Sequence, residues 1–238
     1  MLTAIIVGAG SSRRMGFNKL FAMLGGKPVI AHSIDAFART KSVDEIIVVA
    51  HPGRLPEVRE LLNRHKVPKL KSVVAGGNRR QDSVRKGLEA LGAAAEFVAI
   101  HDAARPLIQP EQIERIYESA RLHGAAAAAT PVTDTLKRAD DNHFVCGGVE
   151  REGLYAMQTP QIFARDLLEK AYRVVAAQKL SVTDEVSAVD MLPARVLLVP
   201  DNEFNLKITY PGDLPVAELL LNRAGPNEVG KVAPTAKV

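Results

Sequence analysis

Short apolar runs alternate with amphipathic segments along most of this 238-residue chain. Continuous apolar runs are typical of strands that are covered on both faces; here they span Leu2–Val7, Glu45–Ala50, Lys71–Ala75, Phe97–His101 and Ala125–Pro131. The segments between them predict helices over Pro28–Arg39, Leu55–Arg64, Asp82–Leu91 (with Asp82 as its N-cap) and Pro110–His123. This alternation predicts an α/β fold: a doubly wound, mostly parallel, Rossmann-like sheet with helices on both faces.

The alternation stops after Pro131. Residues 132–155 carry Thr, Asp, Gly and charged residues in alternation, which predicts an extended β-arm inserted into the fold. The pattern then resumes with helices over Arg165–Gln178 and Asp184–Met191, a strand over Arg195–Val199 and a closing helix over Pro211–Arg223. Residues 224–238 are polar and contain Pro and Gly, which predicts a disordered tail after a single domain at 1–223.

The composition argues against several classes of protein. A net charge of +4, from 31 basic and 27 acidic residues, is small and scattered, so we expect no nucleic-acid binding. Cys146 is the one cysteine, which permits no intrachain disulfide, and the six histidines are too dispersed for a zinc site. No apolar run reaches membrane-spanning length and no basic leader is present, so we expect a cytoplasmic protein without membrane association.

A glycine-rich loop follows the first predicted strand, with the sequence Gly8-Ala9-Gly10-Ser11-Ser12-Arg13-Arg14-Met15-Gly16-Phe17-Asn18-Lys19. Glycines let the backbone approach a phosphate closely, and the cations Arg13, Arg14 and Lys19 suit a triphosphate. Phe17 after Gly16 excludes a Walker A loop. Arg13 stands where a dinucleotide fingerprint has its third glycine, which disfavours a nicotinamide oxidoreductase. Taken alone, the loop could equally be a surface turn with solvated cations.

Two further polar segments lie directly after predicted strands: Gly76-Gly77-Asn78-Arg79-Arg80-Gln81-Asp82-Ser83-Val84 and His101-Asp102-Ala103-Ala104-Arg105-Pro106. A carboxylate and a guanidinium at the carboxyl end of a parallel strand lie where such sheets bind ligands. The structural alternatives are a turn with a helix cap for the first segment and a loop-closing Asp–Arg ion pair for the second.

The first loop resembles the signature loop of the sugar-nucleotide and cytidylyl transferases, in which an Arg and a Lys grip the nucleoside triphosphate. The two later segments resemble those of the 2-C-methyl-D-erythritol 4-phosphate cytidylyltransferase family, whose most specific motif is His-Asp-Ala-Ala-Arg-Pro. Further matching elements lie at Pro131–Lys137, Val149–Tyr155, Gln158–Gln161, Thr183–Glu185 and Asn205–Thr209. The resemblance covers Leu2–Arg223 and implies a nucleotidyltransferase fold that transfers CMP from CTP to methylerythritol phosphate, releasing pyrophosphate, in the non-mevalonate route to isoprenoid precursors.

Residue roles follow from the resemblance alone. It implies a CTP site made by Gly8, Ala9, Gly10, Gly77, Asn78, Ser83 and Asp102. It implies catalytic roles for Arg14, Lys19, Arg151 and Lys207. Acceptor contacts would come from Asp102, Ala103, Arg105, Thr135, Arg151, Thr159 and Lys207. Mg²⁺ would be held mainly by the CTP phosphates, with no protein ligand assigned, and Arg151 would come from the partner subunit of a homodimer joined through the arm.

The predicted chemistry needs no general base. The second pKa of a phosphate monoester is about 6, so the acceptor is already an anion near neutral pH. The difficulty is the approach of one anion to the α-phosphorus of another, so catalysis should consist of positioning and charge neutralisation. A missing Ser–His–Asp set is therefore consistent with this reaction.

Several alternatives remain open at this stage. A cytidylyltransferase for ribitol phosphate or another polyol phosphate shares nearly every motif. A molybdenum-cofactor guanylyltransferase shares the first loop but would not carry the later elements, and a non-catalytic nucleotide-binding regulator should lack Arg14, Lys19 or Lys207. No fused cyclase domain is expected. The chain departs from the family pattern at several positions. Gly8 replaces a usual Ala, Asn18 a usual Pro and Leu20 a usual Gln, Asn78 stands where Asp is common, and Phe204 and Tyr210 alter the last motif.

Overall fold

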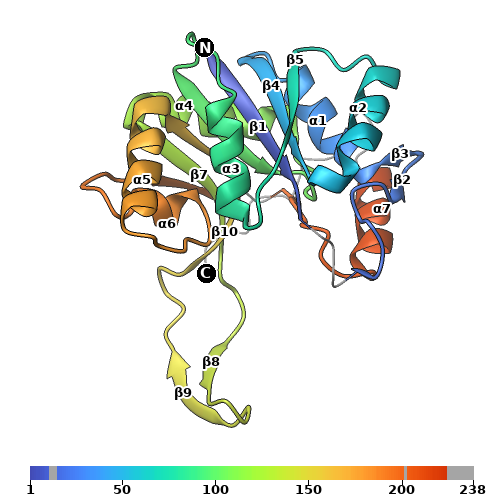
Figure 1. The fold of residues 1–238 in the computed structure, drawn as a ribbon. Coiled ribbons are helices and arrows are strands. Elements are labelled where there is room, and N and C mark those ends of the chain that lie inside the picture. The colour runs from blue at the N-terminus through green and yellow to red at the C-terminus, as the bar shows by residue number, and fades with distance from the viewer. Residues whose placement is uncertain (11–14, 201–202, 224–238) are drawn as a thin grey trace, which may run out of the picture.

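The computed structural model describes residues 1–10, 15–200 and 203–223. Within them, one seven-stranded sheet has the strand order β11-β7-β10-β6-β1-β4-β5. Its members are β1 (Leu2–Gly8), β4 (Val43–Ala50), β5 (Leu70–Ala75), β6 (Phe97–Asp102), β7 (Ala125–Pro131), β10 (Tyr155–Ala164) and β11 (Leu197–Pro200). Only β10 runs antiparallel to its neighbours in this sheet, β6 and β7. The predicted mostly parallel sheet is confirmed (Figure 1).

Helices cover both faces of the sheet. They are α1 (Val29–Arg39), α2 (Leu55–Arg64), α3 (Arg80–Glu89), α4 (Pro110–His123), α5 (Arg165–Ala177), α6 (Glu185–Val189) and α7 (Asp213–Arg223). The apolar side chains of α1, α2 and α4 join one buried cluster, and those of α3, α5 and α6 join another. Helices on both faces are what the doubly wound pattern predicts, so that prediction is confirmed.

The central strand β1 shows how the sequence produces the two faces. Successive side chains of a strand point to opposite sides of the sheet. Ala4 and Ile6 therefore enter the cluster of α1, whereas Ile5 between them enters the cluster of α3. All three side chains are fully buried, so a continuous apolar run is required here in place of an alternating one.

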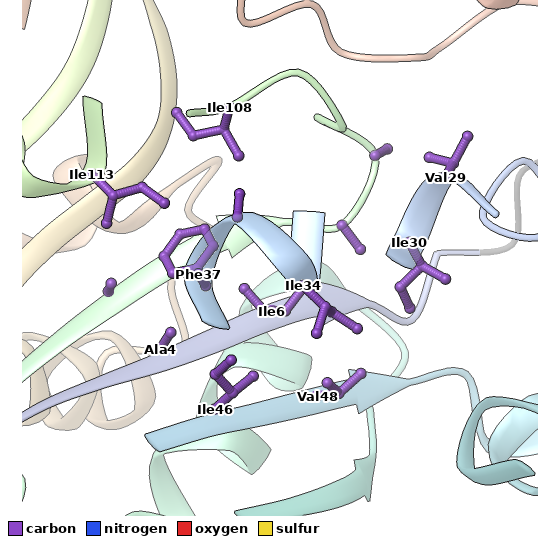
Figure 2. Packing of buried hydrophobic residues seen from close by; sticks show 14 of the residues in the cluster. Ala4, Ile6, Val29, Ile30, Ile34, Phe37, Ile46, Val48, Ile108 and Ile113 are labelled. Carbon is purple, nitrogen blue, oxygen red and sulfur yellow. The ribbon is translucent and has the colours of Figure 1, made fainter. Parts of the chain in front are cut away.

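The packing of α1 on the sheet is seen from close by in Figure 2. Ile34 and Phe37 of α1 lie in one cluster with Ile6 of β1 and Ile46 of β4. Each of these four side chains is fully buried, which contributes roughly 1.5–3 kcal/mol per side chain to folding. The packing of α1 therefore stabilises the strands whose carboxyl ends lead into the polar loops.

A hairpin stands where the sequence predicts an arm. Its strands β8 (Leu136–Ala139) and β9 (Val145–Val149) pair antiparallel with each other and extend away from the sheet (Figure 1). The hairpin links β7 to β10, which are neighbours in the sheet. Phe144 and Val145 are largely exposed, and so is Cys146 on β9. The arm therefore buries little apolar surface within its own chain.

The structure differs from the sequence prediction at β10. The sequence analysis assigned no strand between the arm and the helix at Arg165, and a proline such as Pro160 is unusual in a central strand. The strand tolerates Pro160 because its pairing with β7 is irregular between Met157 and Gln161. A short hairpin, β2 (Met23–Leu24) with β3 (Lys27–Pro28), was also not predicted.

One local prediction was wrong. Asp82 is not the N-cap of α3: the helix begins at Arg80, and Asp82 is the third helical residue, whose Oδ2 accepts from the Arg79 backbone N–H at 3.2 Å. A side chain at that position can reach back to the N-cap, so Asp82 still satisfies the helix start.

Candidate active site

The glycine-rich loop, the Gly76–Ser83 segment and the end of β6 meet at the carboxyl ends of the parallel strands. They line a first cavity of about 320 Å³. This cavity contains all seven residues predicted to bind CTP: Gly8, Ala9, Gly10, Gly77, Asn78, Ser83 and Asp102. Lys19 and Lys207 also line it. Arg14, the remaining cation predicted on this side, lies outside the described residues.

Glycines are required where two of these loops touch. A Cβ at Gly76 would lie 2.4 Å from the Cβ of Ala9, and a Cβ at Gly77 would lie 2.4 Å from the Cβ of Asp82. The Ser83 Oγ accepts from the Gly77 N–H at 3.1 Å and donates to the Arg79 carbonyl at 3.1 Å. Ser83 therefore holds the shape of the loop, whose backbone groups face the cavity.

A second cavity, of about 480 Å³, shares three residues with the first: Arg80, Asp102 and Lys207. We call these three residues the junction. Of the residues predicted to contact the acceptor, Arg105 and Thr159 line the second cavity. Ala103 is fully buried instead, and its carbonyl accepts from the Ser33 hydroxyl at 3.1 Å.

The junction is an alternation of charges. Asp102 Oδ2 lies 2.6 Å from Lys207 Nζ, and its Oδ1 lies 3.2 Å from Arg80 Nε. Burial by itself would raise the pKa of Asp102, but the positive charges of Arg80 and Lys207 outweigh it and hold that pKa far below its ordinary value. The carboxylate is thus charged throughout the neutral pH range and keeps two cations between the cavities.

A hydrogen-bonded chain fixes the loop that carries Asp102. The Asp102 backbone N–H donates to Thr159 Oγ1 at 3.0 Å, and that oxygen lies 3.1 Å from His101 Nδ1. His101 Nε2 lies 3.3 Å from the Arg105 carbonyl, which can only accept. Nε2 must therefore carry the proton, and Thr159 donates to Nδ1. Complete burial lowers the pKa of His101 to about 3, so the ring stays neutral at physiological pH.

Asn205 bonds to two residues that line the second cavity. Arg105 Nη1 donates to the Asn205 carbonyl at 2.6 Å, and Asn205 Nδ2 donates to the Thr159 carbonyl at 2.8 Å. Burial lowers the pKa of Arg105, and the facing charge of Asp102 opposes that shift. Lys19 Nζ donates to the Ile208 carbonyl at 2.6 Å, so the segment that carries Asn205 also contacts the glycine-rich loop region.

The family model of 2-C-methyl-D-erythritol 4-phosphate cytidylyltransferase (IspD) matches residues 2–223. The chain belongs to this family. A 2-C-methyl-D-erythritol 4-phosphate cytidylyltransferase of Dehalococcoides mccartyi is 41% identical over 221 residues, which cover 92% of this chain and 96% of that protein. One of Caldanaerobacter subterraneus is 40% identical over 225 residues, which cover 93% and 99% of the two chains.

Solved structures of cytidylyltransferases share the fold. A 4-diphosphocytidyl-2C-methyl-D-erythritol synthase of Anaerococcus prevotii superposes with a TM-score of 0.82 at 30% identity, covering 94% of this chain and 99% of that one. The Thermus thermophilus cytidylyltransferase superposes with a TM-score of 0.76 at 30% identity, covering 92% and 98%. These matches favour the cytidylyltransferase interpretation over the guanylyltransferase and regulator alternatives.

Two residues that the cytidylyltransferase resemblance assigns to the acceptor lie elsewhere. Thr135 and Arg151 are exposed on the arm, and neither lines the first or the second cavity. The Arg151 guanidinium instead donates to the Thr133 carbonyl. Within one chain the arm does not reach the junction, so the predicted roles of these two residues require another subunit.

The sequence analysis missed Arg80. The family segment Gly-Gly-x-x-Arg-x-x-Ser-Val contains an Arg at this position, but we gave it no role. Arg80 is the first residue of α3, a helix that packs on β1, the neighbour of β6 in the sheet, and it lines both cavities. The described part of the chain contains no helix long and apolar enough to span a membrane.

Proposed function

We propose that the protein transfers CMP from CTP to 2-C-methyl-D-erythritol 4-phosphate, giving 4-diphosphocytidyl-2-C-methyl-D-erythritol and pyrophosphate. The observation that carries the proposal is the junction, where Arg80, Asp102 and Lys207 line two adjoining cavities. A group transfer between two bound anions needs two compartments that meet at a cationic boundary. The family assignment supplies the identity of the two substrates.

The first cavity would hold CTP. In this proposal the backbone of Gly8, Ala9 and Gly10 faces the triphosphate, as successive N–H groups in glycine-rich loops do. Gly77, Asn78 and Ser83 would recognise the cytosine base, with Ser83 acting through the loop backbone that it holds, and Asp102 would contact the ribose. Lys19 and Arg14 would bind the phosphates and stabilise the leaving pyrophosphate.

The second cavity would hold the acceptor. Arg105 and Thr159 line it, and Lys207 stands at its boundary with the first cavity, where it would neutralise charge at the attacked α-phosphorus. Ala103 would contribute indirectly, because its N–H donates to the Val7 carbonyl at 3.0 Å and its carbonyl accepts from Ser33, which holds the turn after Asp102. The acceptor phosphate oxygen forms the new bond to the α-phosphorus while the bond to pyrophosphate breaks, and no proton needs to be removed.

Mg²⁺ would be held mainly by the phosphates of CTP and would neutralise part of their charge. The donor set of the first cavity fits this arrangement. Among the described residues that line it, Asp102 is the one carboxylate, and both of its oxygens already face cations. Within the same described residues no cluster of His, Cys, Asp or Glu is suited to hold a metal ion.

The proposed enzyme is a cytoplasmic homodimer in which each arm completes the site of the other subunit. The exposed Phe144 and Val145 on the arm would be covered by such a partner. Thr135 and Arg151 would then reach the acceptor from the partner's arm. Light scattering under assay conditions tests this, and a monomeric active enzyme would contradict it.

The deciding experiment measures pyrophosphate release with CTP and Mg²⁺, comparing methylerythritol 4-phosphate with ribitol 5-phosphate as acceptor. We expect a strong preference for the first. A preference for ribitol 5-phosphate would keep the mechanism and change the pathway, and activity with neither acceptor would overturn the proposed function.

A further inference from the structure

A buried carboxylate lies behind the junction, and the reaction proposed above does not use it. Glu185 is the first residue of α6 and is fully buried. Its Oε1 lies 2.8 Å from Arg80 Nη1 and accepts from the Tyr172 hydroxyl at 3.0 Å. Burial raises the pKa of Glu185, and the adjacent positive charge of Arg80 opposes that shift. Acidic and basic side chains thus alternate from the interior to the cavities: Glu185, Arg80, Asp102, Lys207.

The two ends of this series differ in exposure. The Glu185 side chain is 1% exposed and the Lys207 side chain 40%, with Arg80 at 26% and Asp102 at 11% between them. Arg80 is the only member that contacts both carboxylates, through Nη1 on one side and Nε on the other. The position of the Arg80 guanidinium, and with it that of Asp102, therefore depends on the buried Glu185 carboxylate.

Arg80 needs such a partner. It is the first residue of α3, where the helix dipole disfavours a positive charge. If Glu185 lost its charge, Arg80 would have Asp102 as its one carboxylate and could turn its forked end toward it, drawing Asp102 away from Lys207. With Glu185 charged, Nη1 of Arg80 pairs with Glu185 in the interior, and Nε alone pairs with Asp102.

Glu185 itself is held by rigid elements. Its backbone N–H donates to Gln161 Oε1 at 3.1 Å, and Gln161 Nε2 donates to Asp184 Oδ2 at 2.9 Å. Gln161 belongs to β10 and is 1% exposed. A side chain carried on the sheet through such bonds keeps its position to the precision that a catalytic site requires.

The pair is poorly suited to a purely stabilising role. Within the described residues, Glu185 Oε2 and Arg80 Nη2 are buried and have no hydrogen-bond partner. Buried ion pairs repay their desolvation only when the remaining polar atoms are satisfied. An ion pair with one unsatisfied atom on each side costs folding free energy, which favours a functional reason for its presence.

We propose that Glu185 is a positioning residue: it holds Arg80 so that Asp102, and through it Lys207, keeps its place between the nucleotide and the acceptor. This role rests on the transferase activity proposed above. Glu185 lines neither the first nor the second cavity, so its loss should slow the transfer step and leave the binding of CTP nearly unchanged.

The test compares Glu185→Gln with Tyr172→Phe. Gln keeps the volume and a hydrogen-bond acceptor but removes the charge, whereas Phe removes the other contact of Glu185 and leaves its pairing with Arg80. We expect kcat for pyrophosphate release to fall about 10- to 100-fold in Glu185→Gln, since small misplacements of reacting groups have effects of this order. The Kd for CTP, measured by calorimetry, should change less than about 3-fold, and Tyr172→Phe should keep kcat within about 3-fold of wild type.

Arg80→Lys provides a second variant if Glu185→Gln does not fold, as judged from circular dichroism and thermal unfolding. A single ammonium cannot reach both carboxylates as the guanidinium does, so the same loss of kcat is expected. A folded variant of either kind with kcat within about 3-fold of wild type would overturn the positioning role. An equal loss in Tyr172→Phe, or a loss explained by weaker CTP binding, would do the same. A wild-type protein inactive with every acceptor would instead remove the transferase and this role together.

Discussion

The sheet and the arm contribute to the candidate site in different ways. Asp102 and Thr159 are buried at 7% and 4% exposure and are hydrogen-bonded through neighbouring strands. Thr135 and Arg151 are exposed on a two-stranded hairpin that lies apart from both cavities. Side chains on the sheet have their geometry before any ligand binds, whereas those on the arm need a second surface to define theirs. In the proposed function, one chain would supply the groups that line both cavities, and the partner's arm would add Thr135 and Arg151 to the acceptor site.

The largest effect is expected on the sheet side of this comparison. Lys19→Ala should lower kcat on the order of 10²-fold or more, because it removes a cation aimed at the charge that develops on the phosphates. Lys27→Ala is the matched control, since Lys27 is exposed, pairs with Asp35 and does not line the first cavity. Pyrophosphate release at saturating substrates measures both, and near-normal turnover of Lys19→Ala would remove Lys19 from the mechanism.

The second prediction concerns the pH dependence of stability that follows from the buried, neutral ring of His101. Its pKa is about 3 in the folded protein and 6.5 as the ordinary value, so the unfolded chain binds one more proton between these pH values. The contribution of His101 to the free energy of unfolding should therefore be complete above pH 6.5. It should decrease by about 1.4 kcal/mol for each pH unit as the pH drops from 6.5 toward 3.

Denaturant unfolding at several pH values measures this dependence. His101→Asn removes the titrating group, so its stability should fall less steeply over the same pH range than that of the wild type. Equal slopes for the two proteins would show that His101 is not buried in the neutral form.

The arm side of the comparison is tested by Arg151→Ala. We expect the KM for the acceptor to rise about 10-fold, as for the loss of a charged hydrogen bond of roughly 1.5 kcal/mol, with CTP affinity and thermal stability unchanged. Arg138→Ala, an exposed arginine on the same hairpin, should change none of these values. An unaltered acceptor KM in Arg151→Ala would confine the acceptor site to a single chain.

The smallest effect concerns packing under the glycine-rich loop. A Cβ at Gly8 would lie 3.0 Å from Leu20 Cδ1 and 3.4 Å from Ala103 Cβ, so Gly8→Ala should destabilise the fold by about 1 kcal/mol. Gly147→Ala on the arm, where nothing lies within 4 Å, should produce no packing strain. Thermal unfolding of both variants measures this difference between the packed site at Gly8 and the open site at Gly147. Equal unfolding midpoints for the two variants would contradict the predicted packing strain at Gly8.

Most elements of the fold could be predicted because the residues that define each one lie next to one another in the sequence. The bounds of α2, α4 and β7 agree with those expected from apolar spacing and from the flanking proline and glycine residues. The strand β10 could not be predicted, because its pairing partners are remote in sequence and Pro160 argues against a strand. Local pattern describes the elements well and says little about an exception that tertiary pairing tolerates.

The candidate site shows the same limit. Residues that lie in family motifs, such as Asp102 and Lys207, could be named from the sequence, yet their ion pair joins positions far apart in the chain. Arg80 and Glu185 join across the two helix starts of α3 and α6, and no spacing rule relates them. A series of ion pairs between residues remote in sequence depends on the topology, so it can be recognised only when the structure is known.

The exposed thiol on the arm makes the molecule convenient for spectroscopy. Cys146 is the one cysteine of the chain, so a maleimide dye would label β9 alone, without mutagenesis. The sheet and both cavities would stay unmodified, and the dye would report on the hairpin, the part whose surroundings should change most when subunits meet. Dilution of a labelled sample could then test whether the proposed dimer dissociates, while CTP binding is monitored separately in the same solution.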